Sequence, residues 1–168
     1  MSLWFTLRAA DLRDAEGVAR LCERADRAPW PAAVLAPHPD RCSLVAIEGD
    51  GALIGVAKTH LHVDDDPPAP AGHYLGGIVV DPAWRRRGVG TALTLARLDW
   101  VSQRAAAVYY FTNVRNAASL ALHARLASTR WPGRTPSAAS ARTSPKVNWF
   151  CTGSPQALKC PLLWRRKE

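Results

Sequence analysis

Residues 76–93 read GGIVVDPAWRRRGVGTAL and contain a short apolar segment, a proline and three arginines, which are followed by two glycines separated by one residue. We interpret the stretch as a strand, a turn and the start of a helix. The first turn of a helix leaves backbone N–H groups unpaired, and the helix dipole favours an anion there. Arginines beside these amides suit a pyrophosphate that carries further phosphate. The stretch therefore predicts a phosphate-binding turn, with a plain surface turn and solvated arginines as the alternative.

Hydrophobic periodicity predicts alternating strands and helices on both sides of this turn. The expected strands cover residues 4–11, 42–48, 52–63, 73–80 and 107–113, and the expected helices cover 12–25, 90–106 and 116–126. The proline-rich segment 28–40 is expected to be irregular with a short helix, and EGDG at 48–51 to be a hairpin turn. These elements predict a mixed α/β (α+β) fold.

Two of the expected helices have an apolar face that we expect to pack on the sheet, and Asp11 is the expected N-cap of the first. The residues of these faces are Leu12, Ala15, Val18, Ala19 and Cys22 in the first helix, and Ala92, Leu93, Ala96, Leu98 and Trp100 in the second.

Length and composition favour a single cytosolic domain. The chain has 168 residues, of which 48% are hydrophobic, and no segment resembles a signal peptide or a membrane span. The four cysteines have no paired spacing, so we expect reduced thiols and no metal site. The net charge of +8 is uneven: residues 1–126 carry 14 Lys and Arg against 13 Asp and Glu, whereas residues 127–168 carry 8 against 1.

The opening stretch resembles the acyl-CoA signature of the GNAT N-acetyltransferase superfamily, V-x-P-x-x-R-x-x-G-x-G before a long helix. The matching positions are Val80, Pro82, Arg85, Gly88 and Gly90, and the resemblance covers roughly residues 3–126. It implies a mostly antiparallel central sheet flanked by helices, with acetyl-CoA as co-substrate. The strand residues Ile78, Val79 and Val80 would pair with the pantetheine arm, and the turn residues Arg85, Arg86, Arg87, Gly88, Val89, Gly90 and Thr91 would hold the pyrophosphate.

A second element, in residues 116–126, resembles the N-x-x-A-x-x-x-Y helix beside the cofactor's thiol. Asn116 matches, Ser119 stands for the small residue, and His123 occupies the position usually held by tyrosine. The resemblance implies that His123, as an imidazolium, donates a proton to the departing thiolate. The alternative is a solvent-facing helical histidine.

The general base is harder to assign, because many relatives carry a glutamate where this chain has Gly76 and Gly77. Backbone amides at a bulge in this strand are the expected oxyanion donors. His73 is the first candidate base, followed by His60, His62 and the acidic run 64–66. That run would attract a cationic amine such as a polyamine or an aminoglycoside, or is simply a solvated loop.

The segment 127–168 departs from the family pattern, which expects Gly-Phe and a closing hairpin of two strands. It contains no aspartate and has little periodicity. One explanation is that the gene lost one nucleotide near codon 127, so that the rest is translated out of frame. With that nucleotide supplied, Gly-Phe becomes possible at this point, and the codons of residues 148–151 encode Leu-Val-Leu whichever synonymous codons the gene uses. The alternative is a lineage-specific basic tail. We expect a core at 1–126, an irregular tail at 127–168 without the closing hairpin, and either reduced stability or coverage of the open edge in a homodimer.

The leading interpretation is an acetyl-CoA-dependent N-acetyltransferase that acts on a primary amine of a small molecule or peptide. A catalytically weak or inactive CoA-binding domain comes second, because the strand lacks a carboxylate and the tail is irregular. A nucleic-acid-binding module comes third and depends on the tail's charge alone.

Overall fold

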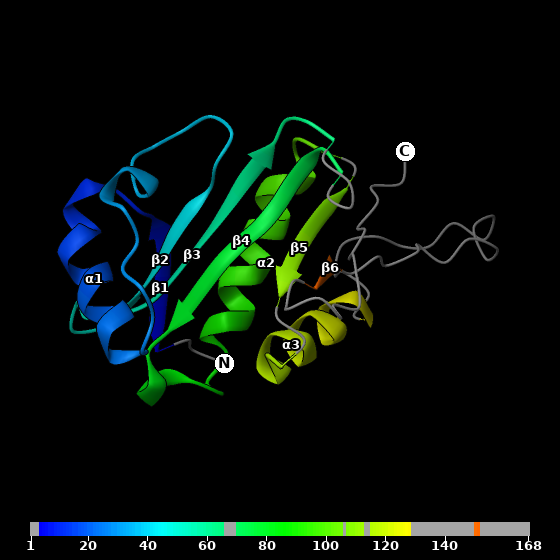
Figure 1. Ribbon diagram of the computed structural model, residues 1–168. Coiled ribbons are helices and arrows are strands. Elements are labelled where there is room, and N and C mark those ends of the chain that lie inside the picture. Colours follow the sequence, from blue (N-terminus) through cyan, green and yellow to red (C-terminus); the bar gives the residue numbers. More distant parts are fainter. Residues whose placement is uncertain (1–3, 66–69, 106, 113–114, 129–149, 152–168) are drawn as a thin grey trace.

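The computed structural model describes residues 4–65, 70–105, 107–112, 115–128 and 150–151. Its strands form one sheet in the order β1-β2-β3-β4-β5-β6 (Figure 1). The strands are β1 (Phe5–Ala9), β2 (Ser43–Glu48), β3 (Leu53–His62), β4 (Gly72–Val80), β5 (Val108–Thr112) and β6 (Phe150–Cys151); the helices are α1 (Ala15–Arg24), α2 (Val89–Ser102) and α3 (Ala117–Ser128). Neighbours from β1 to β4 are antiparallel, and β5 joins β4 in parallel. The predicted mixed, mostly antiparallel sheet flanked by helices is confirmed.

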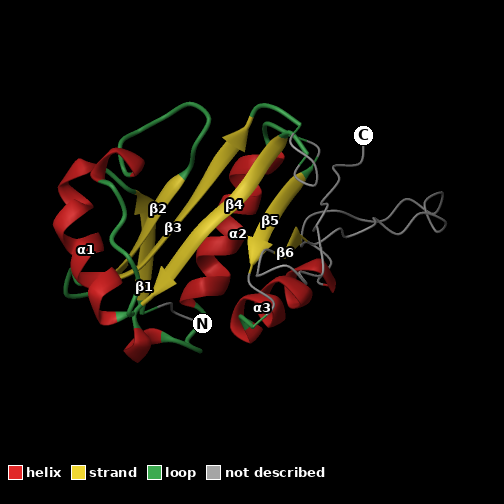
Figure 2. Cartoon of the chain, in the orientation of Figure 1, coloured by secondary structure: helices red, strands yellow, loops and turns green. Residues whose placement is uncertain are grey.

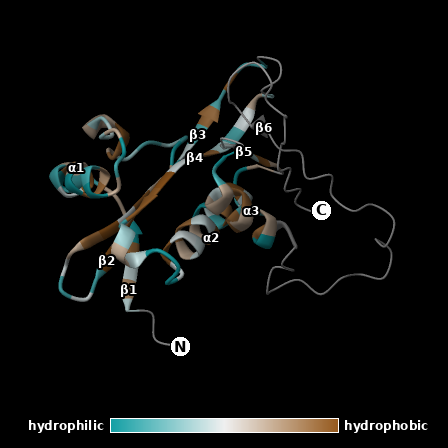
Figure 3. Ribbon diagram, turned by 60° about the horizontal axis from the view of Figure 1, so that its bottom comes forward, coloured by the Kyte–Doolittle hydropathy of each residue, from teal (hydrophilic) through white to brown (hydrophobic). Residues whose placement is uncertain are grey.

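The sheet lies between α1 on one face and α2 and α3 on the other (Figure 3). Val45, Val56 and Val79 face α1, and they form one cluster with buried residues of that helix. The opposite face packs on α2 closely at Gly55, where a Cβ atom would lie 2.9 Å from Val89 Cγ1. Because no side chain fits there, α2 approaches the sheet directly, which fixes where the helix begins.

Helix α1 begins three residues later than expected. Asp11 caps a 3-10 turn at Leu12–Asp14 rather than the α-helix itself, and its side chain accepts from the Arg13 amide at 2.8 Å. Because a 3-10 turn has fewer residues per turn than an α-helix, different residues of this segment point toward the sheet. The predicted face is therefore partly wrong: Val18 and Cys22 are buried, but Leu12 is 57% exposed. Ala19 is also exposed.

Helix α2 is confirmed, but it ends at Ser102 and its buried face differs from the expected one. Leu93 is buried as predicted, whereas the other four expected residues are only half-buried. The fully buried positions of α2 include the polar Thr94 and Arg97. Apolar periodicity did not reveal this face because two of its members are hydrophilic.

Most of segment 127–168 lies outside the described residues. Figure 2 shows the short strand β6 beside β5, and the pairs are Phe111 with Phe150 and Thr112 with Cys151 in parallel. The domain boundary at 126, the missing hairpin and the frame shift therefore remain predictions. In the described part of the chain, no helix has the length and apolar character needed to cross a membrane.

Candidate functional site

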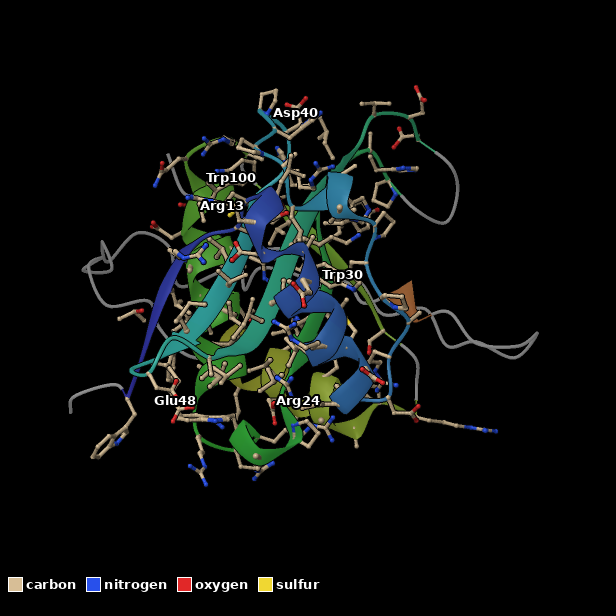
Figure 4. The ribbon with its side chains drawn as sticks, turned by 90° about the vertical axis from the view of Figure 1, so that its left-hand side faces the viewer. Arg13, Arg24, Trp30, Asp40, Glu48 and Trp100 are labelled. Atoms are coloured by element: carbon tan, nitrogen blue, oxygen red, sulfur yellow. The ribbon has the colours of Figure 1, made fainter. Side chains whose placement is uncertain are left out.

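The turn between β4 and α2 is anchored at its first residue. Asp81 Oδ1 accepts from the Ala83 amide at 3.0 Å, which caps a 3-10 turn at Pro82–Trp84. Its other oxygen, Oδ2, accepts from Arg24 Nε at 2.7 Å, and Arg24 is labelled near the end of α1 in Figure 4. The ion pair ties the turn to the opposite face of the sheet.

The turn then takes the backbone conformation that exposes helix amides. Arg86 has φ +64° and Gly88 has φ +88°, and α2 starts at Val89. The Ala92 amide donates to the Gly88 carbonyl at 2.9 Å. The amides that precede Ala92 have no earlier carbonyl to bond within the helix, so they are available to an anion. Arg85, Arg86 and Arg87 are exposed beside them.

A β-bulge lies in β4 at Gly76 and Gly77. On β3, Ala57 pairs with Ile78 and Thr59 with Leu75, so Lys58 alone faces the two glycines. Gly77 has φ +87°, a conformation that glycine adopts without strain. The bulge predicted in this strand is present in the structure.

Beyond the bulge, one edge of β4 is open. β4 pairs with β5 only from His73 to Leu75, and the two strands then diverge (Figure 1). Within the described residues, Ile78–Val80 have no strand partner on the β5 side. A Cβ atom on Gly90 would lie 3.8 Å from Ile78, Val80 and Leu122, so this edge, the start of α2 and α3 meet at one place. An extended molecule could pair with the open edge and reach the exposed amides of α2.

His123 lies inside the fold and not on its surface. Its ring stacks on Tyr110 with centroids 3.7 Å apart, and its Nδ1 donates to the Ser119 carbonyl at 2.8 Å. Burial lowers the pKa of His123 to about 4, so the ring is neutral near pH 7. The role of His123 as proton donor stays a prediction, whereas the solvent-facing alternative is wrong because the residue is buried. Asn116 caps α3 by accepting from the Ser119 amide at 3.1 Å.

His73 and His60 lie on opposite faces of the sheet. His73 is buried on the α2 side, where it meets Trp100 edge-on at 5.6 Å between centroids. His60 alternates with Val56 and so lies on the α1 side, stacked on Tyr74 at 5.4 Å. A Cβ atom on Gly76 would lie 2.3 Å from His60 Nδ1, so the glycine leaves room for this ring beside the bulge.

The electrostatics of His60 suit a proton acceptor. Burial lowers the pKa of His60, and the charges of Lys58, His62 and His73 lower it further, so the ring is neutral near pH 7. Burial also lowers the pKa of His73. Asp64 and Asp65 are exposed in the loop beyond β3, and residue 66 lies outside the described residues.

Sequence reasoning missed one residue at the bulge. The side chain of Arg97 reaches the bulge from α2 and bonds the carbonyls of Lys58 and Gly77. No sequence signal marks it, since an arginine in a helix is normally exposed.

Comparison with known proteins agrees with the motif. The sequence model described as the acetyltransferase (GNAT) family matches residues 5–127. Mycothiol acetyltransferase of Renibacterium salmoninarum is 30% identical over 97 residues, which cover 55% of this chain and 27% of that protein. The chain thus spans about a quarter of this relative.

Two solved structures have the same fold. The ribosomal-protein-S18-alanine N-acetyltransferase of Escherichia coli has a TM-score of 0.60 at 19% identity, covering 95% of this chain and 90% of that chain. NAA60 of Arabidopsis thaliana, solved in complex with acetyl-CoA, has a TM-score of 0.59 at 17% identity, with 73% and 82% covered.

Proposed function

The chain belongs to the acetyltransferase (GNAT) family, and on this premise we propose that it transfers an acetyl group from acetyl-CoA to the amine of a small molecule or peptide. The observation that carries the proposal is the open edge of β4, which leads to the arginine and glycine turn at the start of α2. A pantetheine arm has the amide groups needed to pair with such an edge, and its pyrophosphate fits the exposed helix amides.

In the proposed complex, Ile78–Val80 bond the pantetheine arm and the amides from Arg86 to Thr91 hold the pyrophosphate. The exposed arginines 85–87 add charge-assisted contacts. Ser119 and the capped start of α3 lie toward the thiol end. Bound acetyl-CoA supplies the activated acyl group, and the protein's residues orient it.

The acceptor amine must lose a proton before or during its attack on the thioester. We assign this role to His60, because it is neutral, partly exposed and beside the bulge whose amides face the thioester in this arrangement. His73 remains the alternative, but it packs beneath Trp100 on the other face of the sheet. An amine that enters from the α1 side meets His60 first.

A CoA-binding domain without activity is a second candidate function. Two observations favour it: among the described residues no carboxylate lies at the bulge, and His123 is neutral. The nucleic-acid-binding alternative depends on residues outside the described part of the chain, and we do not propose it.

Calorimetry with acetyl-CoA, followed by thiol release with a panel of amines, tests the proposal. We expect micromolar binding and release of free CoA with at least one amine. Binding without thiol release across amino acids, peptides and aminoglycosides would favour the second candidate. No heat at millimolar ligand would contradict both.

A further inference from the structure

Arg97 is a buried cation whose guanidinium bonds almost entirely to backbone. The residue is 1% exposed. Its Nη1 donates to the Lys58 carbonyl at 2.9 Å and to the Gly77 carbonyl at 3.1 Å. Its Nε donates to the Leu93 carbonyl at 3.3 Å, and its Nη2 donates to Thr94 Oγ1 at 3.0 Å. Among the described residues, no carboxylate pairs with it.

A buried charge without a counterion is expensive, and most cores avoid it. Burial lowers the pKa of Arg97 to about 10, so the side chain still carries its charge near pH 7. The thiol of Cys42 interacts with this charge, but burial raises the pKa of Cys42 and keeps it protonated. The positive charge is therefore not neutralised where it lies.

The two carbonyls that Nη1 binds belong to residues that face each other across the β-bulge. In a trans peptide the C=O and the next N–H point in opposite directions. Because the Gly77 carbonyl points to Arg97, the Ile78 N–H points away from it. A cation on the carbonyl polarises this peptide and makes the Ile78 amide a stronger donor.

We propose that Arg97 is a positioning residue for acetyl transfer: through the Gly77–Ile78 peptide it strengthens the amide that holds the thioester oxygen as that oxygen becomes negative. This inference rests on the proposed function, because it requires acetyl-CoA along the edge of β4. Arg97 itself touches neither substrate nor cofactor, and it transfers no proton.

Arg97 keeps its proton and its charge throughout the acetyl transfer. The amine nitrogen attacks the thioester carbon, and the π electron pair moves to the oxygen beside the Ile78 amide. His60 takes the amine proton, the electron pair on oxygen re-forms the carbonyl, and the C–S bond breaks with its electron pair leaving on sulfur as the CoA thiolate. A positive field favours both anions. Besides burial, the charge of Arg97 contributes to the lowered pKa of His123 on α3.

Infrared spectroscopy of bound acetyl-CoA tests the proposal without knowledge of the acceptor. With the thioester carbonyl labelled with carbon-13, we expect its stretching band to lie at lower wavenumber on the wild-type protein than in water. In Arg97→Met the band should return toward its position in water. The matched control is Arg104→Met, which removes an exposed arginine near the end of the same helix and should leave the band unchanged.

Arg97→Lys keeps the charge but has a shorter side chain without the Nε and Nη2 donors that bond Leu93 and Thr94, so we expect an intermediate band. If Arg97→Met does not fold, the band of acetyl-CoA bound to Arg97→Lys is compared with that of the wild type instead. Wild-type protein whose bound acetyl-CoA shows the band position of free acetyl-CoA would overturn the inference regardless of either variant, and so would an Arg97→Met protein that binds acetyl-CoA with the wild-type band. Failure of the wild type to bind acetyl-CoA would instead overturn the proposed function, and the inference with it.

Discussion

The imidazole of His60 occupies the space beside Gly76 that a side chain would need: a Cβ atom there would lie 2.3 Å from His60 Nδ1. A side chain at position 76 would therefore displace the ring of His60, the proposed general base. If His60 is the general base, as proposed, then the base lies on β3 and requires glycine at position 76.

His60→Gln should lower kcat about 10²-fold or more, because general-base catalysis is lost while the ring's volume is nearly kept. Because burial lowers the pKa of His60 from its ordinary 6.5, the wild-type rate should rise with pH through a midpoint below pH 6.5. The variant should lack this rise. The measurement is a pH profile of kcat/KM with an amine that wild type acetylates, and His62→Gln is the control. If the pH profile of kcat/KM were unchanged in His60→Gln, His73 would again be the first candidate for the general base.

Gly76→Ala tests the same contact from the other strand. The added methyl group must displace the His60 ring, so we expect a loss of activity similar to that of His60→Gln, while calorimetry should show nearly unchanged CoA affinity. If Gly76→Ala acetylated the amine as well as wild type, the position of His60 would not matter for the reaction.

Gly88→Ala should weaken CoA binding for a conformational reason alone. Gly88 has φ +88° and open space around its Cα, so alanine costs about 1–2 kcal/mol in backbone strain and displaces no neighbour. The matched control is Gly51→Ala, at φ +93° in the β2–β3 turn and also in open space. Both variants should lower Tm by similar amounts, but only Gly88→Ala should lower CoA affinity. Equal affinities would contradict the assigned site.

The exposed arginines beside this turn should contribute through charge. Arg87→Ala should weaken acetyl-CoA binding about tenfold, the size of one charge-assisted contact, and make the affinity less sensitive to salt. Tm should not change, because the side chain is exposed and its contact with Trp84, 5.2 Å from the ring centroid, is a weak one at the surface. Arg27→Ala, an exposed arginine after α1, is the control. We would abandon the phosphate site if both variants bound acetyl-CoA equally well.

His123 should make the fold sensitive to acid. Its pKa is about 4 in the folded protein and 6.5 in the reference state, so the unfolded chain binds more protons between these values. Its contribution is fully present above pH 6.5 and is lost as pH falls toward 4, up to about 3 kcal/mol. His123→Phe, which keeps an aromatic ring against Tyr110, should flatten the pH dependence of the free energy of unfolding in this range. His38→Gln, at an exposed histidine, should not.

Much of the fold could be predicted because strong local signals coincide with the buried faces. Alternating residues marked β1, the EGDG turn marked the β2–β3 pair, the apolar run marked β4, and the glycines at 88 and 90 marked the start of α2. The phase of α1 could not be predicted, because Asp11 was expected to cap an α-helix and caps a 3-10 turn instead. The sequence does not distinguish these turns, since both accept the same capping residue.

The site could be predicted only where backbone geometry decides it. The turn and the bulge follow from glycine positions, whereas the roles of side chains depend on which face of the sheet they occupy. His73 and His60 are both strand histidines, and only strand register separates them. His123 is buried because it stacks on Tyr110, a contact between α3 and β5 that no local pattern encodes.

Restoring the reading frame should stabilise the protein. If one nucleotide was lost near codon 127, supplying it converts residues 148–151 to Leu-Val-Leu, an apolar segment suited to a strand core. In the present chain, β5 is paired on its outer side only at Phe111 and Thr112 among the described residues. A hairpin in place of this short contact would bury more apolar surface and cover the rest of the edge, so we expect a higher Tm and a steeper unfolding transition. The present chain and a chain ending at Ser128 are the references. A restored chain no more stable than either would favour a basic tail that evolved as it stands.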